Sequence, residues 1–194
     1  MGSSEQELIE KAKAGDKYAF SELFYAYKDR IFGYLYRYIG NYQTAEDLTI
    51  ETFMLAYTNL AGYKEMGVFS SWLFRIATNC AKKELRRRSR HKEVSLEEPA
   101  MDGAENMTLG DTLTDEKRKP DNEARENELQ EFIYKVVDNL KKKYKDVLIL
   151  CDSEGLKYEE AAKVLRCNYK TVGTRLKRAR KLFYDILKKH GFKI

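Results

Sequence analysis

Proline is confined to one short part of this chain. The 194 residues contain two prolines, Pro99 and Pro120, and both lie between residues 91 and 121. Because proline breaks a helix interior, the segments on either side are free to form long helices. Apolar residues in those segments recur every three or four positions, the spacing of one face of an amphipathic helix. No stretch of useful length alternates as a strand would, so we predict an all-α chain.

This pattern divides the chain into three parts. Residues 1–90 carry four helical patterns and form a first predicted domain, and residues 122–194 form a second. Residues 91–121 lose the periodicity, hold both prolines and contain more acidic than basic side chains. We interpret them as a flexible acidic linker that lets the flanking domains act at separate places. The alternative is a solvated spacer with no role of its own.

A few polar residues and glycines predict where helices of the first domain begin and end. Asp16 can cap the second helix, because a short acceptor side chain satisfies the first free amides. Gly40 suits the left-handed position just after that helix. Thr44 is predicted to begin the third helix, and Ser70 or Ser71 the fourth.

Composition excludes several classes of protein. No apolar run is long enough to span a bilayer or to serve as a signal peptide, so we expect a cytoplasmic protein without membrane insertion of its own. Cys80, Cys151 and Cys167 are widely spaced among apolar positions, which is typical of reduced core cysteines. No cluster of His, Asp and Glu has metal-ligand spacing, and no glycine loop fits a phosphate. We therefore expect no metal, no cofactor and no enzymatic activity.

The segment from Val68 to Arg90 joins two patterns. Its first half places Phe69, Trp72 and Ile76 on one apolar helix face. Its second half carries six basic side chains at exposed positions: Lys82, Lys83, Arg86, Arg87, Arg88 and Arg90. Such a run is either a solvated helix end, favoured by the helix dipole, or a surface that binds a polyanion.

Residues 158–181 fit a helix-turn-helix. Ala161 and Ala162 in its first helix are small enough for a second helix to cross closely, and Asn168 can cap that second helix. Arg166 lies in the turn, where glycine is common, and a side chain there costs about 1 kcal/mol in strain.

The outward face of the second helix is polar and basic: Tyr169, Lys170, Thr171, Thr174, Arg175, Lys177, Arg178 and Lys181. This layout suits DNA, because the first residues of a recognition helix reach base edges while the basic residues beyond them meet phosphates. The alternative is a helix pair with a solvated basic face.

The order of these motifs resembles that of the extracytoplasmic-function (ECF) group of sigma-70 family sigma factors, the exchangeable promoter-recognition subunits of bacterial RNA polymerase. Four blocks carry the resemblance: the residues from Asp16 to Tyr27, AEDLTIETF at 45–53, FSSWLFRIATN at 69–79, and YEEAAKVL with TVGTRLKRAR between 158 and 180. The resemblance covers nearly the whole chain. It implies a region 2-like domain at residues 1–90 and a region 4-like helix-turn-helix domain at 122–194.

Carried over residue by residue, the resemblance implies binding roles. Core RNA polymerase would be contacted by Asp47, Ile50 and Glu51, although the two carboxylates could equally complement the helix dipole. The −10 element would be recognised and melted by seven residues: Tyr63, Lys64, Asn79, Lys82, Lys83, Arg86 and Arg87. Asn79 would read a base through its amide, and Tyr63 would stack on an unpaired base unless it is a core aromatic. The outward face of the recognition helix would read the −35 element.

Three positions depart from the family pattern. Ile50 stands where the family usually has glutamine, Gly173 where a basic residue is usual, and Lys170 where glycine is common. A glycine inside a helix also costs about 1 kcal/mol relative to alanine. The −35 sequence that this chain prefers should therefore not be copied from relatives.

The resemblance implies three partners: core RNA polymerase, promoter DNA and an anti-sigma factor, often membrane-tethered, that masks both domains. We predict an ECF-type sigma factor that directs promoter recognition and transcription initiation. The first alternative is a polymerase-independent helix-turn-helix regulator, which explains the C-terminal motif but neither the acidic helix nor the basic segment. A nucleic-acid enzyme is the weaker alternative.

Overall fold

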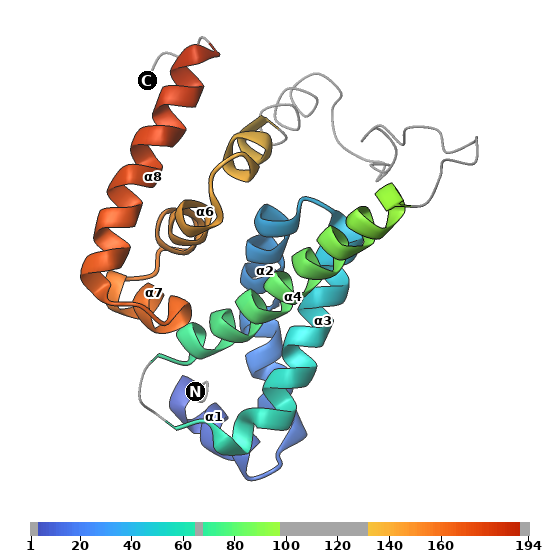
Figure 1. Ribbon diagram of the computed structural model, residues 1–194. Coiled ribbons are helices and arrows are strands. Elements are labelled where there is room, and N and C mark those ends of the chain that lie inside the picture. Colours follow the sequence, from blue (N-terminus) through green and yellow to red (C-terminus); the bar gives the residue numbers. More distant parts are fainter. Residues whose placement is uncertain (1–3, 65–67, 98–131, 191–194) are drawn as a thin grey trace, which may run out of the picture.

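The structure is a computed structural model that describes residues 4–64, 68–97 and 132–190. Within these ranges every regular element is helical, as the sequence predicts (Figure 1). None of the described helices is both long and apolar enough to cross a membrane. Of the predicted linker and second domain, residues 98–131 and 191–194 lie outside the described ranges.

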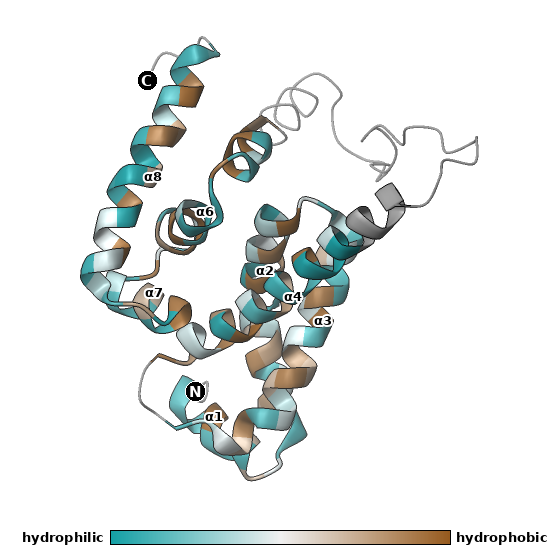
Figure 2. Cartoon of the chain, viewed as in Figure 1, coloured by the Kyte–Doolittle hydropathy of each residue, from teal (hydrophilic) through white to brown (hydrophobic). Residues whose placement is uncertain are grey.

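The elements form two helical units. The N-terminal unit contains α1 (Glu5–Lys13), α2 (Lys17–Ile39), α3 (Tyr42–Asn59), the short 3₁₀ turn η1 (Leu60–Gly62) and α4 (Phe69–Glu97). The C-terminal unit contains helical residues 132–138, then α6 (Lys142–Leu148), the π-helical turn η2 (Ile149–Ser153), α7 (Tyr158–Leu165) and α8 (Tyr169–Lys189). Figure 2 shows apolar residues in bands along these helices, with the hydrophilic stretches between them most extended on α8.

Helices α2, α3 and α4 pack against one another around aromatic side chains. Tyr34 at the centre is fully buried, with its ring edge-on to that of Phe74 at 5.4 Å between centroids. A buried phenol needs a hydrogen-bond partner, and the hydroxyl of Thr78 on α4 lies 2.8 Å away. Burial raises the pKa of Tyr34, so the hydroxyl stays neutral.

Two of the predicted helix ends are confirmed. A carboxylate oxygen of Asp16 accepts the amide of Tyr18 at 2.8 Å and caps α2. Gly40 has φ 72° and ends the same helix in the left-handed conformation, which glycine adopts without the steric cost of a side chain.

The predicted start of the third helix is wrong. Helix α3 begins at Tyr42, because the side-chain oxygen of Asn41 accepts the amide of Thr44 at 2.9 Å and takes the capping position. Asn and Thr are both good caps, and Asn41 comes first after the left-handed Gly40. Thr44 therefore lies in the first turn of α3.

Both predicted caps of the fourth helix are also wrong. Helix α4 begins at Phe69, so Ser70 and Ser71 lie inside its first turn, where both are buried. The helix ends at Glu97, past the predicted domain end at residue 90.

The two units share one continuous core and pack directly against each other, with α4 against α7 and α2 against η2. Asp146 of α6 is buried at their boundary. Its carboxylate accepts a hydrogen bond from the hydroxyl of Tyr38 at 2.5 Å and lies 3.3 Å from the ammonium group of Lys82. Glu154, just after η2, forms an ion pair with Arg37 through its carboxylate. Its backbone carbonyl oxygen accepts a hydrogen bond from the guanidinium of Arg30 at 3.1 Å. The described units therefore form one body.

Gly40 lies where the two units touch. The hydroxyl of Tyr134 donates to the carbonyl oxygen of Ile39 at 2.9 Å. A Cβ atom at Gly40 would lie 1.9 Å from the ring of Tyr134. Residue 40 must therefore both adopt positive φ and leave room for this ring.

We expect Gly40→Ala to destabilise the full-length chain by more than about 1–2 kcal/mol, the cost of a left-handed alanine alone, because Tyr134 must also move. Urea unfolding measures the difference in free energy. Gly62→Ala is the matched control, since a Cβ there meets no atom within 4 Å and the backbone is not left-handed. Equal stability of the two variants would contradict the role given to Gly40.

Candidate functional site

Helix α8 carries the predicted recognition surface. It follows Asn168, whose side-chain oxygen accepts the amide of Lys170 at 2.9 Å, as the predicted cap requires. Three residues face inward and are fully buried: Val172, Leu176 and Ala179. The predicted DNA-contacting residues are exposed except for Thr171 and Arg175, which are half-buried. The helix therefore separates an apolar face from a basic one.

The turn between α7 and α8 uses a left-handed residue that is not glycine. Arg166 has φ 52°, and the next amide, that of Cys167, donates to the carbonyl of Ala162 at 3.1 Å. Ala161 and Ala162 are buried on α7, which packs directly on α8. The geometry is that of a helix-turn-helix, and the positive φ of Arg166 costs about 1 kcal/mol.

An ion pair orients α8 within its unit. The guanidinium of Arg180 contacts Asp152 through Nε at 2.9 Å and a terminal nitrogen at 2.5 Å. Asp152 lies in the π-helical turn η2, a rare geometry that places its side chain toward α8. Arg180 is thus held by a bidentate contact although its side chain is exposed.

Two residues of α6 extend this surface, and the sequence analysis did not predict them. Lys143 and Tyr144 line a hollow of about 530 Å³ together with five residues of α8: Lys170, Thr171, Thr174, Arg175 and Arg178. The run of lysines at residues 141–143 was an available signal. Tyr144 is half-buried and packs against the apolar core.

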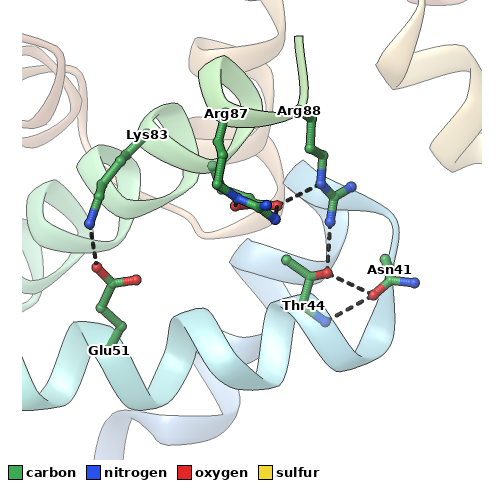
Figure 3. A network of polar contacts seen from close by, with 7 residues as sticks. Asn41, Thr44, Glu51, Lys83, Arg87 and Arg88 are labelled. Carbon is green, nitrogen blue, oxygen red and sulfur yellow. Dashed lines mark hydrogen bonds and ion pairs between the residues drawn. The ribbon is translucent and has the colours of Figure 1, made fainter. Parts of the chain in front are cut away.

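Two lysines of the predicted −10 set form ion pairs within the molecule. Lys82, whose side chain is 22% exposed, is paired with Asp146 of the C-terminal unit. Lys83 lies 3.2 Å from Glu51 of α3, but its side chain is 79% exposed and such a pair contributes little to stability (Figure 3). Lys82 is therefore occupied by the neighbouring unit, while Lys83 faces solvent.

Glu84 holds two arginines on the same helix. Its carboxylate accepts two hydrogen bonds from the guanidinium of Arg87, at 2.7 and 2.9 Å, and one from that of Arg88, at 2.7 Å. Arg88 also donates to the hydroxyl of Thr44 at 2.7 Å, which ties α4 to the capped start of α3 (Figure 3). Hydrogen bonds from Arg87, and then from Arg88, lower the pKa of Glu84 to about 2. Arg88 is thus structural, whereas Arg86 and Arg87 are exposed.

Tyr63 is buried in a cluster of aromatic rings. Its side chain is 7% exposed, with the ring of Trp72 at 5.0 Å and that of Phe69 at 5.6 Å. The ammonium of Lys13 lies 5.4 Å from the ring centroid. A ring enclosed in this way has no free face for a base, so the exposed stacking residue expected from the resemblance is, in this structure, a core aromatic. Lys64 beside it is exposed.

Asn79 lies on α4 just before the basic residues. It is exposed between Thr78 and Cys80, which are both buried. Its amide group therefore projects from a rigidly packed part of the helix, about one turn from Lys82 and Lys83.

The predicted polymerase-contacting residues lie together on α3. Asp47 and Ile50 are exposed, and Glu51 is half-buried. Met54 and Tyr57 are also exposed and lie on the same face of α3 as Ile50, so they extend an apolar strip along the helix. These two apolar residues were not predicted, although their spacing from Ile50 is visible in the sequence.

Family models match both units. The model described as Sigma-70 region 2 matches residues 23–91, and the one described as Sigma-70, region 4 matches residues 132–183. An ECF RNA polymerase sigma-E factor from Haemophilus influenzae is 33% identical over 92% of this chain and 93% of its own length. The RNA polymerase sigma-H factor from Pseudomonas aeruginosa is 32% identical over 91% of this chain and 90% of its own.

Solved structures have the same fold. CnrH in complex with the cytosolic domain of CnrY matches with a TM-score of 0.71 and 20% identity, over 96% of this chain and 99% of that one. The sigma factor RpoE, in complex with the anti-sigma factor NepR from Bartonella quintana, matches with a TM-score of 0.66 and 22% identity. This match covers 87% of this chain and 96% of that one.

The hydrogen bonds of Glu84 with Arg87 and Arg88 should make the free energy of unfolding depend on pH. Because the pKa in the folded chain, about 2, lies below the ordinary value of 4.5, the charged carboxylate stabilises the fold above pH 4.5. This contribution is lost as the pH falls through about 2. We expect Glu84→Gln to be less stable than the parent at pH 7, with a difference that shrinks in acid. Urea unfolding across this pH range measures it.

Glu22→Gln is the matched control, because Glu22 is exposed on α2. A stability difference for Glu84→Gln that stays constant with pH would contradict the pairing.

Proposed function

Because the chain belongs to the ECF group of RNA polymerase sigma factors, we propose that it binds core RNA polymerase and directs it to a set of promoters. One observation carries the proposal. Relatives of this group are similar along about nine-tenths of the chain, so the likeness includes both helical units. A regulator that used the helix-turn-helix alone would not require the N-terminal unit.

In this proposal the exposed face of α8 reads the −35 element in the major groove. Thr171, Thr174 and Arg175 lie near the start of the helix, from which recognition helices reach base edges. Arg178 and Lys181, further along, are suited to phosphates. Gly173 leaves a gap in this row because it has no side chain; a Cβ there would make an ordinary van der Waals contact with the ring of Tyr158, at 3.5 Å. The base preference should therefore differ from that of relatives with a long side chain there.

The basic end of α4 would hold one strand of the −10 element. Asn79 would read a base, and Lys64, Lys83, Arg86 and Arg87 would attract the backbone, since all are exposed. Lys82 would join them after releasing Asp146. Binding a melted strand favours the open promoter because the ligand shifts the equilibrium toward the state it binds. We assign no chemical step to the chain itself.

The exposed face of α3 would dock on core RNA polymerase through Asp47, Ile50 and Glu51. We further propose an anti-sigma factor as a partner, because one solved structure of this fold is the sigma factor RpoE in complex with the anti-sigma factor NepR, and another is CnrH in complex with the cytosolic domain of CnrY. Such a partner would hold the chain in the cytoplasm or at the inner face of a membrane.

Transcription in vitro tests the proposal. Purified chain is added to core RNA polymerase and a library of promoter fragments, and transcripts are mapped. We expect initiation at a shared sequence motif that core enzyme alone does not use. Failure with every bacterial core tried, combined with binding to DNA in the absence of polymerase, would favour a polymerase-independent regulator.

Loss of two arginines on α8 tests the −35 surface. Arg175→Ala with Arg178→Ala should weaken binding to a duplex carrying the −35 element by roughly tenfold or more, since a good bidentate base contact contributes about 1–3 kcal/mol. Affinity for core polymerase should not change. Lys188→Ala with Lys189→Ala removes the same charge from the far end of α8 and should have little effect. Parallel loss of DNA and core binding would indicate misfolding instead.

A charge reversal on α3 tests the polymerase surface. Asp47→Arg should lower the affinity for core polymerase, because it replaces an exposed carboxylate by a cation at the contact. Asp29→Arg makes the same change at an exposed position of α2 and serves as the control. Fluorescence titration of labelled chain with core measures both. Unchanged affinity for Asp47→Arg would remove this residue from the interface.

A further inference from the structure

The hollow between the start of α6 and α8 has an unusual lining. All seven described residues that line it carry either a cation or a hydroxyl group, and none of them carries a carboxylate: Lys143, Tyr144, Lys170, Thr171, Thr174, Arg175 and Arg178. Its volume is about 530 Å³. Ammonium, guanidinium and hydroxyl groups in this arrangement are suited to an anion, and phosphate oxygens accept hydrogen bonds from all three.

Five of these residues belong to the face of α8 that we place in the major groove. The remaining two, Lys143 and Tyr144, come from a different helix and form the opposite wall. A duplex that lies against α8 presents its phosphate backbone at the rim of the groove. A residue of α6 at this hollow would therefore meet backbone rather than base edges.

We propose that Lys143 and Tyr144 bind a backbone phosphate of the strand that borders the −35 major groove. This inference rests on the proposed function and deepens it, since it adds a second helix to the DNA-binding surface. Phosphate contacts of this kind set affinity and register without reading sequence.

The ring of Tyr144 orients the exposed side chain of Lys143. Its side chain is exposed, and its ammonium group lies 5.1 Å from the centroid of the Tyr144 ring. The amide of Tyr144 donates to the carbonyl of Lys141 at 2.7 Å, which fixes the first turn. A cation over an aromatic face is held in place without losing its charge. The lysine is thus oriented while it remains free to bind an anion.

The adjacent lysines have different surroundings. Lys142 is exposed, and partial desolvation with Lys82 and Arg86 nearby lowers its pKa, while Asp146 opposes the shift. Lys141 lines a neighbouring hollow that also involves Leu182 and Ile186 and shares Tyr144 and Arg178 with the first. Of the three consecutive lysines, only Lys143 lines the cationic hollow.

The test uses holoenzyme reconstituted with full-length chain and a promoter duplex selected with that holoenzyme, beside the same duplex with a scrambled −35 element. Dissociation constants are measured across a range of salt concentrations. For Lys143→Ala we expect several-fold weaker binding on both duplexes, with the slope of log K against log salt reduced by about 0.9. Lys143→Arg should restore both. Tyr144→Phe should weaken binding while leaving the slope unchanged.

Two variants separate the possible failures. Lys188→Ala removes an exposed lysine at the far end of α8 and should match the parent. Arg175→Ala with Arg178→Ala should lose affinity mainly on the intact −35 element. If only this arginine variant weakens binding, the phosphate contact is wrong and the proposed function stands. If neither variant changes binding, the −35 surface itself is wrong.

A loss for Lys143→Ala that is confined to the intact −35 element would also overturn the inference, because it would make Lys143 a base-reading residue. Thermal unfolding of each variant identifies losses caused by misfolding.

Discussion

A buried carboxylate joins the two helical units. Asp146 is 7% exposed, accepts a hydrogen bond from Tyr38 of α2 and pairs with Lys82 of α4. A buried charge is tolerated only when it is paired and hydrogen-bonded, and removal of one partner leaves the other uncompensated. Because two different helices supply the partners, α6 is positioned against both at once. Helix α8 packs on α6, while α7 packs on η2 and also directly on α4.

This contact also connects the two candidate DNA surfaces. Lys82 belongs to the basic end of α4, whereas Asp146 lies on α6, the helix that carries Lys143. The ammonium group of Lys82 cannot make this ion pair with Asp146 and an equally close ion pair with a DNA phosphate at the same time. In the proposed function, engagement of a strand at Lys82 would therefore compete with its pairing to Asp146, while Lys83 and Arg86 would not face this competition.

Much of the fold could be predicted from the sequence because its signals are local. Helical periodicity locates the recognition helix, and the inward positions Val172 and Leu176 are buried as expected. Asn168 caps α8 as predicted because capping depends on residues that are adjacent in the chain. Arg166 adopts the left-handed conformation that the turn requires despite its side chain.

The remaining features depend on contacts between distant residues. Asp146 follows a run of lysines in the sequence and there resembles a surface charge, and only tertiary packing buries it. Tyr63 lies in a loop whose composition does not distinguish a base-stacking residue from a core aromatic. Lys143 is one of three similar lysines, and its role depends on the approach of α8. In each case the decisive neighbour lies on another helix.

The contact of Tyr134 with the end of α2 links two residues that are far apart in the sequence. Tyr134 needs an empty volume beside the Ile39 carbonyl, and Gly40 provides it. An asparagine at position 40 could adopt the backbone conformation, but its Cβ would occupy the place of the ring. Room for it appears only when position 134 carries a smaller side chain. Among related chains, positions 40 and 134 should therefore vary together, as a pair shaped by volume rather than by charge.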